Sequence, residues 1–343
     1  MKISYRTYNL QFRYPFTISN GRTKTHQPTF IVQLEHLGRV GYGEAPAITY
    51  YNIPVEKMAE DLERKKIFVE KFAFTEPDRW WHYLHHLFPA NPFLVCALDI
   101  AGWDLYGKIK GTPIKEFWQP SQSKNTITDY TIGIDTIERM LAKMQEKPWP
   151  VYKIKLGTPE DIAIIKSLRK HTDALFRIDA NAGWKKEEAL EKITAFKDLG
   201  VEFIEQPLAK DDWEGMKWLY ERSPLPLYAD ESCVAESDVE KCHQHFHGIN
   251  IKLTKCSGLT PALRMIKQAR ELEMGVMVGS MNESTIGSAA IAHLQTIIDY
   301  LDADGPLLLK EDIATGLTYD DNGRVNVSSE PGLGISVTDL YQK

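Results

Sequence analysis

The distribution of hydrophobic and polar residues changes near residue 126. Beyond that point, short apolar runs typical of strands alternate with longer stretches in which apolar residues recur at helical spacing. Repeated strand–helix units give parallel strands joined by right-handed crossovers, and eight such units favour a closed (β/α)8 barrel over an open sheet. The eight strands are expected over residues 129–134, 151–156, 175–180, 201–206, 227–231, 248–253, 276–280 and 300–304.

The first part of the chain follows a different order, with strands first and helices afterwards. Residues 3–12 and 29–34 are rich in β-branched and aromatic residues, so we expect two strands separated by a polar loop that contains glycine. Residues 53–118 have the pattern of helices, and this segregation is typical of an α+β unit. The predicted organisation is an α+β domain over 1–125, a TIM-type α/β barrel over 126–315 and a C-terminal segment over 316–343 that packs back on the first domain.

Composition excludes several classes of function. Apolar residues make up 43% of the chain and charged residues 26%, which is ordinary for a globular protein. The 41 basic and 47 acidic residues give a net charge of −6, which offers no electrostatic attraction to nucleic acid or to an anionic membrane. No apolar run reaches about 18 residues, so no membrane-spanning helix is expected. The expected partner is therefore a small-molecule substrate or another protein.

The start of the sequence and the cysteines indicate a compartment. Residues 1–16 alternate polar and apolar positions, so we expect no signal peptide there. The four cysteines, Cys96, Cys233, Cys242 and Cys256, include no C-x-x-C pair and are too few for a disulfide framework. Reduced thiols and a cytoplasmic location are the expectation.

Polar side chains stand at the carboxyl ends of the predicted strands, where barrels of this type carry their chemistry. Three consecutive strands end in a carboxylate, namely Asp179, Glu205 and Asp230. Each alone would be an ordinary solvated loop charge, but three carboxylates that converge on one barrel mouth repel one another unless a cation lies between them. Oxygen ligands on rigid strands suit a hard cation, with Mg²⁺ as the first choice.

Lysines stand on the strands to either side of these carboxylates. Lys153 and Lys155 end the second predicted strand and Lys252 ends the sixth, and these two strands face each other across an eight-stranded barrel. Two amines that flank a metal-bound group suit two-base proton transfer, in which one base removes a proton and the other returns one to the opposite face. The nearby cation and second lysine should lower the pKa of such a base, and the cation would stabilise the enediolate of a carboxylate substrate.

The last predicted strands add further polar groups. Ser280 ends the seventh strand, and Asp302 and Asp304 end the eighth, which lies opposite the fourth strand and its Glu205. We therefore expect these two aspartates far from the metal, towards the other end of a bound substrate. Their simplest alternative role is to cap the turn that follows.

Together these residues resemble the enolase superfamily and, within it, the muconate-lactonizing subgroup. The first 125 residues resemble the capping domain of that family, notably at Gly43-Glu-Ala-Pro46 and Ala101-Gly-Trp-Asp-Leu-Tyr-Gly-Lys108. A lysine on both faces argues against the sugar-acid dehydratases of similar fold, which use a histidine base. The barrel motifs that carry the resemblance are Lys153-Ile-Lys155, Asp179-Ala-Asn181, Glu205-Gln-Pro207, Ala229-Asp-Glu-Ser232 and Asn250-Ile-Lys252.

The resemblance implies a role for each of these residues. It implies one Mg²⁺ per subunit, bound by the three carboxylates named above. Lys155 and Lys252 would form the acid–base pair, Lys153 would assist by its charge near the substrate carboxylate, and Asn181 would belong to the substrate-binding residues. Barrels of this family commonly associate, so a homo-oligomer is also expected.

The Asp302-Ala-Asp304 pattern resembles the dipeptide epimerases, which include enzymes for L-Ala-D/L-Glu, D-Ala-D/L-Ala and hydrophobic dipeptides. Two carboxylates suit the α-ammonium group of a dipeptide, and Ser280-Met-Asn-Glu-Ser284 also resembles the corresponding epimerase segment. The implied reaction inverts the α-carbon of the C-terminal residue. N-succinylamino acid racemase and o-succinylbenzoate synthase are the alternatives among enzymes. A non-catalytic barrel is the alternative outside them, although it would be expected to lack some ligands or bases.

The N-terminal domain bears on the preferred side chain. An arginine in its first loop is expected in epimerases that act on Ala-Glu, and the corresponding position here is Thr23, between Arg22 and Lys24. Alanine, an apolar residue and glutamate therefore all stay open as the second residue of the dipeptide. The residues expected to close over the site and exclude water are Ile18, Tyr50 and Tyr51.

Overall fold

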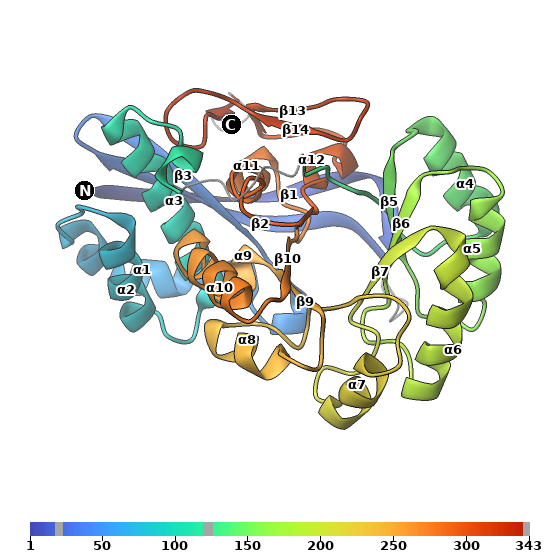
Figure 1. Cartoon of the computed structure of the whole chain (residues 1–343). Coiled ribbons are helices and arrows are strands. Elements are labelled where there is room, and N and C mark those ends of the chain that lie inside the picture. Colours follow the sequence, from blue (N-terminus) through green and yellow to red (C-terminus); the bar gives the residue numbers. More distant parts are fainter. Residues whose placement is uncertain (18–22, 119–125, 339–343) are drawn as a thin grey trace.

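The computed structural model describes residues 1–17, 23–118 and 126–338. It begins with an antiparallel sheet in the order β1-β2-β3, on which α3 packs (Figure 1). These elements, called the N-terminal lobe below, are β1 (Lys2–Thr17), β2 (Thr23–His36), β3 (Arg39–Pro46), α1 (Val55–Lys71), α2 (Pro77–Leu87) and α3 (Pro92–Lys110). The first two strands and the helical region agree with the sequence prediction, whereas β3 was not predicted.

Glycines explain both the packing of β3 and its weak sequence signal. A Cβ atom at Gly43 would lie 1.9 Å from the carbonyl oxygen of Ala97 on α3, and one at Gly41 would lie 2.3 Å from that of Ala101. Only glycine lets the strand run this close to the helix, although glycine is unfavourable in strands and hides the usual pattern. The close approach carries the next residue, Glu44, to the boundary between the lobe and the barrel.

The second part of the chain is a sheet of parallel strands in the order β4 to β11, which curls into the predicted barrel (Figure 1). Thr128, just before the first strand, forms a parallel bridge with Leu301 in the last strand and so brings the two edges together. The strands are β4 (Tyr130–Ile132), β5 (Val151–Lys155), β6 (Leu175–Asp179), β7 (Val201–Glu205), β8 (Leu227–Ala229), β9 (Gly248–Ile251), β10 (Gly275–Val278) and β11 (Tyr300–Leu301). All eight overlap the predicted strands, and the barrel fold is confirmed.

Helices follow the strands along the barrel. Most are amphipathic and bury one face, but the helix after β11 is a single turn, in line with its weak sequence pattern. The helices are α4 (Ile137–Glu146), α5 (Asp161–Arg169), α6 (Lys186–Phe196), α7 (Trp213–Tyr220), α8 (Glu236–Cys242), α9 (Leu253–Cys256), α10 (Leu259–Glu271), α11 (Thr285–Ala292) and α12 (Gly305–Leu308), with 3-10 turns at Thr49–Tyr51, Ile114–Phe117 and Lys197–Leu199.

The C-terminal segment returns to the lobe. It contains the pairs β12 (Ala314–Thr315) with β15 (Ser336–Val337) and β13 (Leu317–Tyr319) with β14 (Val325–Val327). The amide of Leu333 donates to Asp104 Oδ1 on α3 (2.8 Å), and its carbonyl oxygen lies 3.1 Å from His293 Nε2 of the barrel. The segment therefore bonds to both the lobe and the barrel. The division of the chain into 1–125, 126–315 and 316–343 stays a prediction.

Two further features bear on the environment of the protein. Across residues 1–17, 23–118 and 126–338, no helix combines the length and the apolar composition that a membrane crossing needs. The four cysteines are free thiols, and all of them are buried.

Candidate active site

A cavity of about 640 Å³ opens at the carboxyl ends of the barrel strands, and both parts of the chain form its wall. The lobe contributes Thr23, Lys24, Ile48, Thr49, Tyr50 and Tyr51. The barrel contributes Thr131, Lys153, Lys155, Asn181, Asp230, Glu231, Lys252, Ser280, Met281, Asn282 and Asp302. Most predicted site residues therefore meet at one cavity. Asp179, Glu205 and Asp304 are buried next to it rather than among its described lining residues, and Ile18 lies outside the described residues.

Three carboxylates converge at the floor of this cavity, where Asp230 lines the wall and the other two are buried beside it. Asp179 ends β6, Glu205 ends β7, and Asp230 follows β8 directly. Each is buried, and one oxygen atom from each lies within 4.8 Å of the others. This all-oxygen set on rigid strands fits a hard divalent cation such as Mg²⁺.

The backbone turns sharply after β6 and β7 and so fixes this arrangement. Asn181 and Gln206 have positive φ angles of 43° and 37°, a region that residues other than glycine rarely adopt. The amide of Asn181 donates to Asp179 Oδ1 (2.9 Å). Gln206 Oε1 accepts hydrogen bonds from the amides of Asp230 (3.0 Å) and Ser232 (3.1 Å), so this side chain joins the ends of β7 and β8. Backbone strain of this kind clusters at functional sites.

The three lysines lie between the carboxylates. Lys155 Nζ is 2.5 Å from Asp179 Oδ2 at one side, and Lys252 Nζ is 2.6 Å from Asp230 Oδ2 at the other. Lys153 Nζ lies 2.8 Å from Glu205 Oε2 and 3.3 Å from Asp179 Oδ2. Two ammonium groups that both reach the cavity therefore flank the carboxylate cluster, while Lys153 lies at its centre.

The carboxylates set the charge state of these lysines. Burial disfavours the ammonium form of Lys252, but Asp230 and Glu205 outweigh burial and raise its pKa. The predicted lowering refers to a lysine beside a bound cation and stays a prediction, whereas the ion pair with Asp230 was not foreseen. Burial acts against ionisation of Asp179 as well, but Lys155, Lys153 and Lys252 together outweigh it and lower the pKa of Asp179 to about 2.

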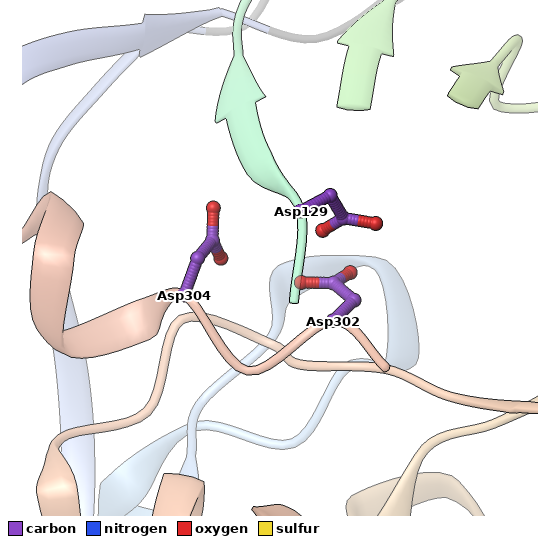
Figure 2. Close-up of side chains that lie close together, drawn as sticks. All are labelled: Asp129, Asp302 and Asp304. Atoms are coloured by element: carbon purple, nitrogen blue, oxygen red, sulfur yellow. The ribbon is translucent and has the colours of Figure 1, made fainter. Parts of the chain in front are cut away.

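Asp302 and Asp304 belong to a second carboxylate cluster together with Asp129 (Figure 2). Asp302 Oδ2 lies 3.0 Å from Lys153 Nζ, and Asp304 Oδ2 accepts a hydrogen bond from the amide of Thr131 (2.6 Å). Asp302 is thus closer to the first cluster than predicted, because the single ammonium of Lys153 contacts both. Burial, reinforced by the charges of Asp302 and Asp129, raises the pKa of Asp304 well above its usual value.

Several residues of this region were not assigned a role from the sequence. Asp129 was counted only as the start of a strand, and its Oδ2 pairs with Arg177 (3.0 Å). Glu231 lines the cavity, where burial and then the charges of Asp230 and Asp179 raise its pKa to about 8. Lys255 lies behind Asp230. The Asp-Glu motif and the second lysine after β9 were visible in the sequence, but only the fold shows what each side chain contacts.

A buried carboxylate of the lobe supports the far wall of the cavity. Glu44 on β3 accepts hydrogen bonds from the amide (3.0 Å) and hydroxyl (2.5 Å) of Ser284, the amide of Gly287 (2.9 Å) and the hydroxyl of Thr29 (2.8 Å). Ser284 caps α11, which follows the cavity-lining residues 280–282 directly. Glu44 therefore joins the lobe to the barrel at the cavity wall.

Comparison with known proteins identifies the family. Residues 135–340 match the sequence model of the family described as "Enolase C-terminal domain-like", and the chain belongs to that family. It is similar to an L-Ala-D/L-amino acid epimerase of Flavobacterium johnsoniae, at 51% identity over 98% of this chain and 100% of the relative.

Two solved structures share the fold along nearly the whole chain. A substrate-liganded L-Ala-D/L-Glu epimerase from Bacillus subtilis has a TM-score of 0.91 and 29% identity, with 98% of this chain and 99% of that chain covered. A dipeptide epimerase from Cytophaga hutchinsonii, complexed with Mg and D-Ala-L-Val, has a TM-score of 0.90 and 27% identity, with 99% and 97% covered.

Proposed function

We propose that this protein is a Mg²⁺-dependent dipeptide epimerase that inverts the α-carbon of the C-terminal residue. The observation that carries the proposal is the placement of Lys155 and Lys252, which line one cavity and flank three buried carboxylates. Epimerisation needs a proton to leave one face of a carbon and another to arrive at the opposite face, which a base on each side accomplishes. The relatives named above carry epimerase names, in line with this reaction.

In the proposed reaction Asp179, Glu205 and Asp230 bind one Mg²⁺ per subunit. The ion would supply positive charge to the substrate carboxylate as the enediolate forms. One of the two lysines removes the α-proton as the neutral amine, and the other donates a proton from its ammonium group to the opposite face. Because both lysines are ion-paired with the carboxylates, one of them must leave its carboxylate before it acts as a base.

Asp302 and Asp304 are proposed to bind the α-ammonium group of the dipeptide. Their cluster with Asp129 holds three carboxylates, of which Asp302 pairs with Lys153 and Asp129 pairs with Arg177. An added ammonium group would favour the ionised form of Asp304, whose pKa is otherwise raised, whereas an N-succinyl group would bring another carboxylate. The cluster therefore favours a dipeptide over the substrates of N-succinylamino acid racemase or o-succinylbenzoate synthase.

The remaining predicted substrate contacts are Asn181 and Ser280 on the barrel side and Thr23 and Tyr51 on the lobe side, all of which line the cavity. The lobe also places Ile48 and Lys24 there. Apart from Lys24, the side chains that the lobe contributes to the cavity wall are neutral. We therefore propose alanine or an apolar residue as the second residue of the dipeptide, with glutamate as a further candidate beside Lys24.

Deuterium exchange tests the proposal. The protein is incubated with Mg²⁺ in D2O together with L-Ala-L-Ala, L-Ala-L-Leu, L-Ala-L-Glu or N-succinyl amino acids, and loss of the α-proton signal is followed by NMR. We expect exchange at the C-terminal residue of at least one dipeptide. Exchange of N-succinyl amino acids without any dipeptide would show that the epimerase assignment is wrong.

Single lysine variants separate the two bases. Lys155→Ala and Lys252→Ala should each abolish epimerisation, yet each should retain exchange from the one stereoisomer whose α-proton faces the remaining lysine. Two-way epimerisation in either lysine variant would remove that lysine from the mechanism.

Asp304→Asn should abolish dipeptide turnover and leave Mg²⁺ binding unchanged.

We further propose a cytoplasmic location and a homo-oligomeric state. The four free, buried thiols are what a reducing compartment maintains.

The adjacent apolar side chains of Ile67 and Phe68 on α1 are more than half exposed, which suits a contact with a second copy. Light scattering coupled to size exclusion would measure the subunit number, and a monomer would rule out the homo-oligomer.

A further inference from the structure

Lys255 is a buried lysine outside the proposed acid–base pair. It lies in the single turn of α9, directly after β9, and only 3% of its surface is exposed. Its Nζ donates to Asp230 Oδ1 (2.6 Å) and to the carbonyl oxygens of Asp230 (2.5 Å) and Cys233 (2.9 Å). The shortest hydrogen bonds of the ammonium group therefore go to the loop that carries Asp230, with a longer one to the carbonyl oxygen of Asn250 on β9 (3.4 Å).

We propose that Lys255 is a positioning residue that holds Asp230 in the orientation of a metal ligand. The inference rests on the proposed metal site, but it goes beyond that site to a residue that is not itself among the described residues lining the cavity. Two backbone carbonyl oxygens fix the ammonium group of Lys255 independently of the Asp230 side chain. The ammonium group in turn engages Oδ1, so Oδ2 would be the oxygen that Asp230 offers to a cation.

Lys255 and Lys252 divide the two oxygens of Asp230 between them. Lys252 Nζ contacts Oδ2 (2.6 Å) and lines the cavity, whereas Lys255 contacts Oδ1 from behind. A cation that takes Oδ2 would displace Lys252 and make it available for proton transfer. It would leave Lys255 in place, because the bonds of Lys255 to backbone carbonyls do not involve Oδ2.

The lobe holds the turn that carries Lys255. Trp81 Nε1 donates to the carbonyl oxygen of Ser257 (3.1 Å), and Asp99 accepts from the amide (2.9 Å) and hydroxyl (2.7 Å) of Thr260. These contacts fix both ends of the turn between α9 and α10. The ammonium group of Lys255 is therefore anchored from the lobe side as well as through the loop after β8.

Calorimetric titration with Mg²⁺ alone tests this role, because it needs no dipeptide. Lys255→Met removes the donors and the charge but retains an unbranched side chain. Outer partners of metal ligands typically contribute 10- to 100-fold to metal affinity, so we expect the Kd for Mg²⁺ to rise by roughly that factor. Lys255→Arg, which keeps the charge and the donors, should recover part of the affinity.

Lys192→Met is the matched control. Lys192 is also buried, and it donates to Asp161 Oδ2 (2.9 Å) and to the carbonyl oxygen of Thr158 (2.8 Å). Neither of these partners is a proposed metal ligand or lines the cavity. It should lower stability without changing the Kd for Mg²⁺. An unchanged Kd in folded Lys255→Met protein would overturn the positioning role.

A crystal structure of the Mg²⁺-bound wild-type protein decides the matter if Lys255→Met does not fold. Lys255 Nζ within hydrogen-bond distance of Asp230 Oδ1, with Mg²⁺ on Oδ2, is the expected result. Mg²⁺ bound to both oxygens, or Lys255 turned away, would overturn the inference. A protein that binds Mg²⁺ through this arrangement but exchanges no dipeptide would refute the proposed function alone.

Discussion

Replacement of Glu44 by glutamine tests how the lobe and the barrel are joined at the cavity wall. The two oxygens of Glu44 accept four hydrogen bonds, with Thr29 Oγ1 and Ser284 N on Oε1 and with Ser284 Oγ and Gly287 N on Oε2. Glutamine has nearly the same shape, but it offers one acceptor oxygen and places two N–H donors where the other oxygen was. In either orientation of the amide, one backbone N–H then faces an N–H group, whereas the hydroxyl on the same side can turn and accept from it.

The magnitude follows from the number of donors that lose an acceptor. A buried donor left unsatisfied costs about 1–3 kcal/mol, and one backbone amide is left in this state. Burial disfavours the charged form of Glu44 and raises its pKa, and removal of this carboxylate offsets part of the loss. We expect the free energy of unfolding to fall by about 1–2 kcal/mol.

Urea unfolding, followed by circular dichroism and tryptophan fluorescence, measures the difference. Glu35→Gln is the matched control, because Glu35 is exposed on β2 and its replacement should change stability by less than about 0.5 kcal/mol. Because Ser284 follows the wall residues 280–282 closely, Glu44→Gln should also raise the KM for the dipeptide. If Glu44→Gln unfolds at the same urea concentration as the wild type, the four hydrogen bonds do not join the two parts as described.

Three further predictions concern stability and the metal. Burial lowers the pKa of His293 to about 4. The neutral imidazole therefore stabilises the fold above pH 6.5, and up to about 3 kcal/mol of this stability is lost as the pH falls towards 4. His293→Gln should remove this pH dependence from the urea midpoint. Gly258→Ala should lower stability by about 3 kcal/mol, because φ is +129° and the new Cβ would lie 2.3 Å from Asp99 Oδ2. Chelation with EDTA should abolish α-proton exchange, and Mg²⁺ at 100 times its Kd should restore exchange and stabilise the protein by about 2.7 kcal/mol.

Each of these has a contrary outcome. Equal pH profiles for the wild type and His293→Gln would show that His293 does not titrate as described. A Gly258→Ala protein with wild-type stability would show that the turn can shift away from Asp99. A melting temperature that is independent of Mg²⁺ would contradict a metal site in the native state.

The barrel and the convergence of its strand-end residues could be predicted, because repeated strand–helix units specify both the fold and the end at which side chains meet. Asp179, Glu205 and Asp230 are neighbours for that reason alone. The predicted distance of Asp302 from these carboxylates was wrong. The prediction used only the order of the strands around the barrel, whereas the ammonium group of Lys153 contacts both Glu205 and Asp302. The direction of the Lys252 pKa shift depends on its contact with Asp230, which spacing does not reveal.

Other features depend on packing and leave little trace in the sequence. β3 lacks a clear strand pattern because its glycines serve close contact with α3 rather than strand propensity. Lys255 lies three residues after Lys252, but whether it faces the cavity or the back of Asp230 is decided by the single turn of α9. Such details require the tertiary structure.

The composition of the cavity wall separates chemistry from side-chain selection. All the carboxylates and lysines proposed for proton transfer and metal binding come from the barrel, whereas Thr23, Ile48 and Tyr51 come from the lobe. Change in the lobe can therefore alter which dipeptides are accepted without altering the reaction. A chimaera that combines this barrel with the lobe of a relative would inherit the relative's selectivity, provided that the contacts of Glu44, Trp81 and Asp99 are preserved.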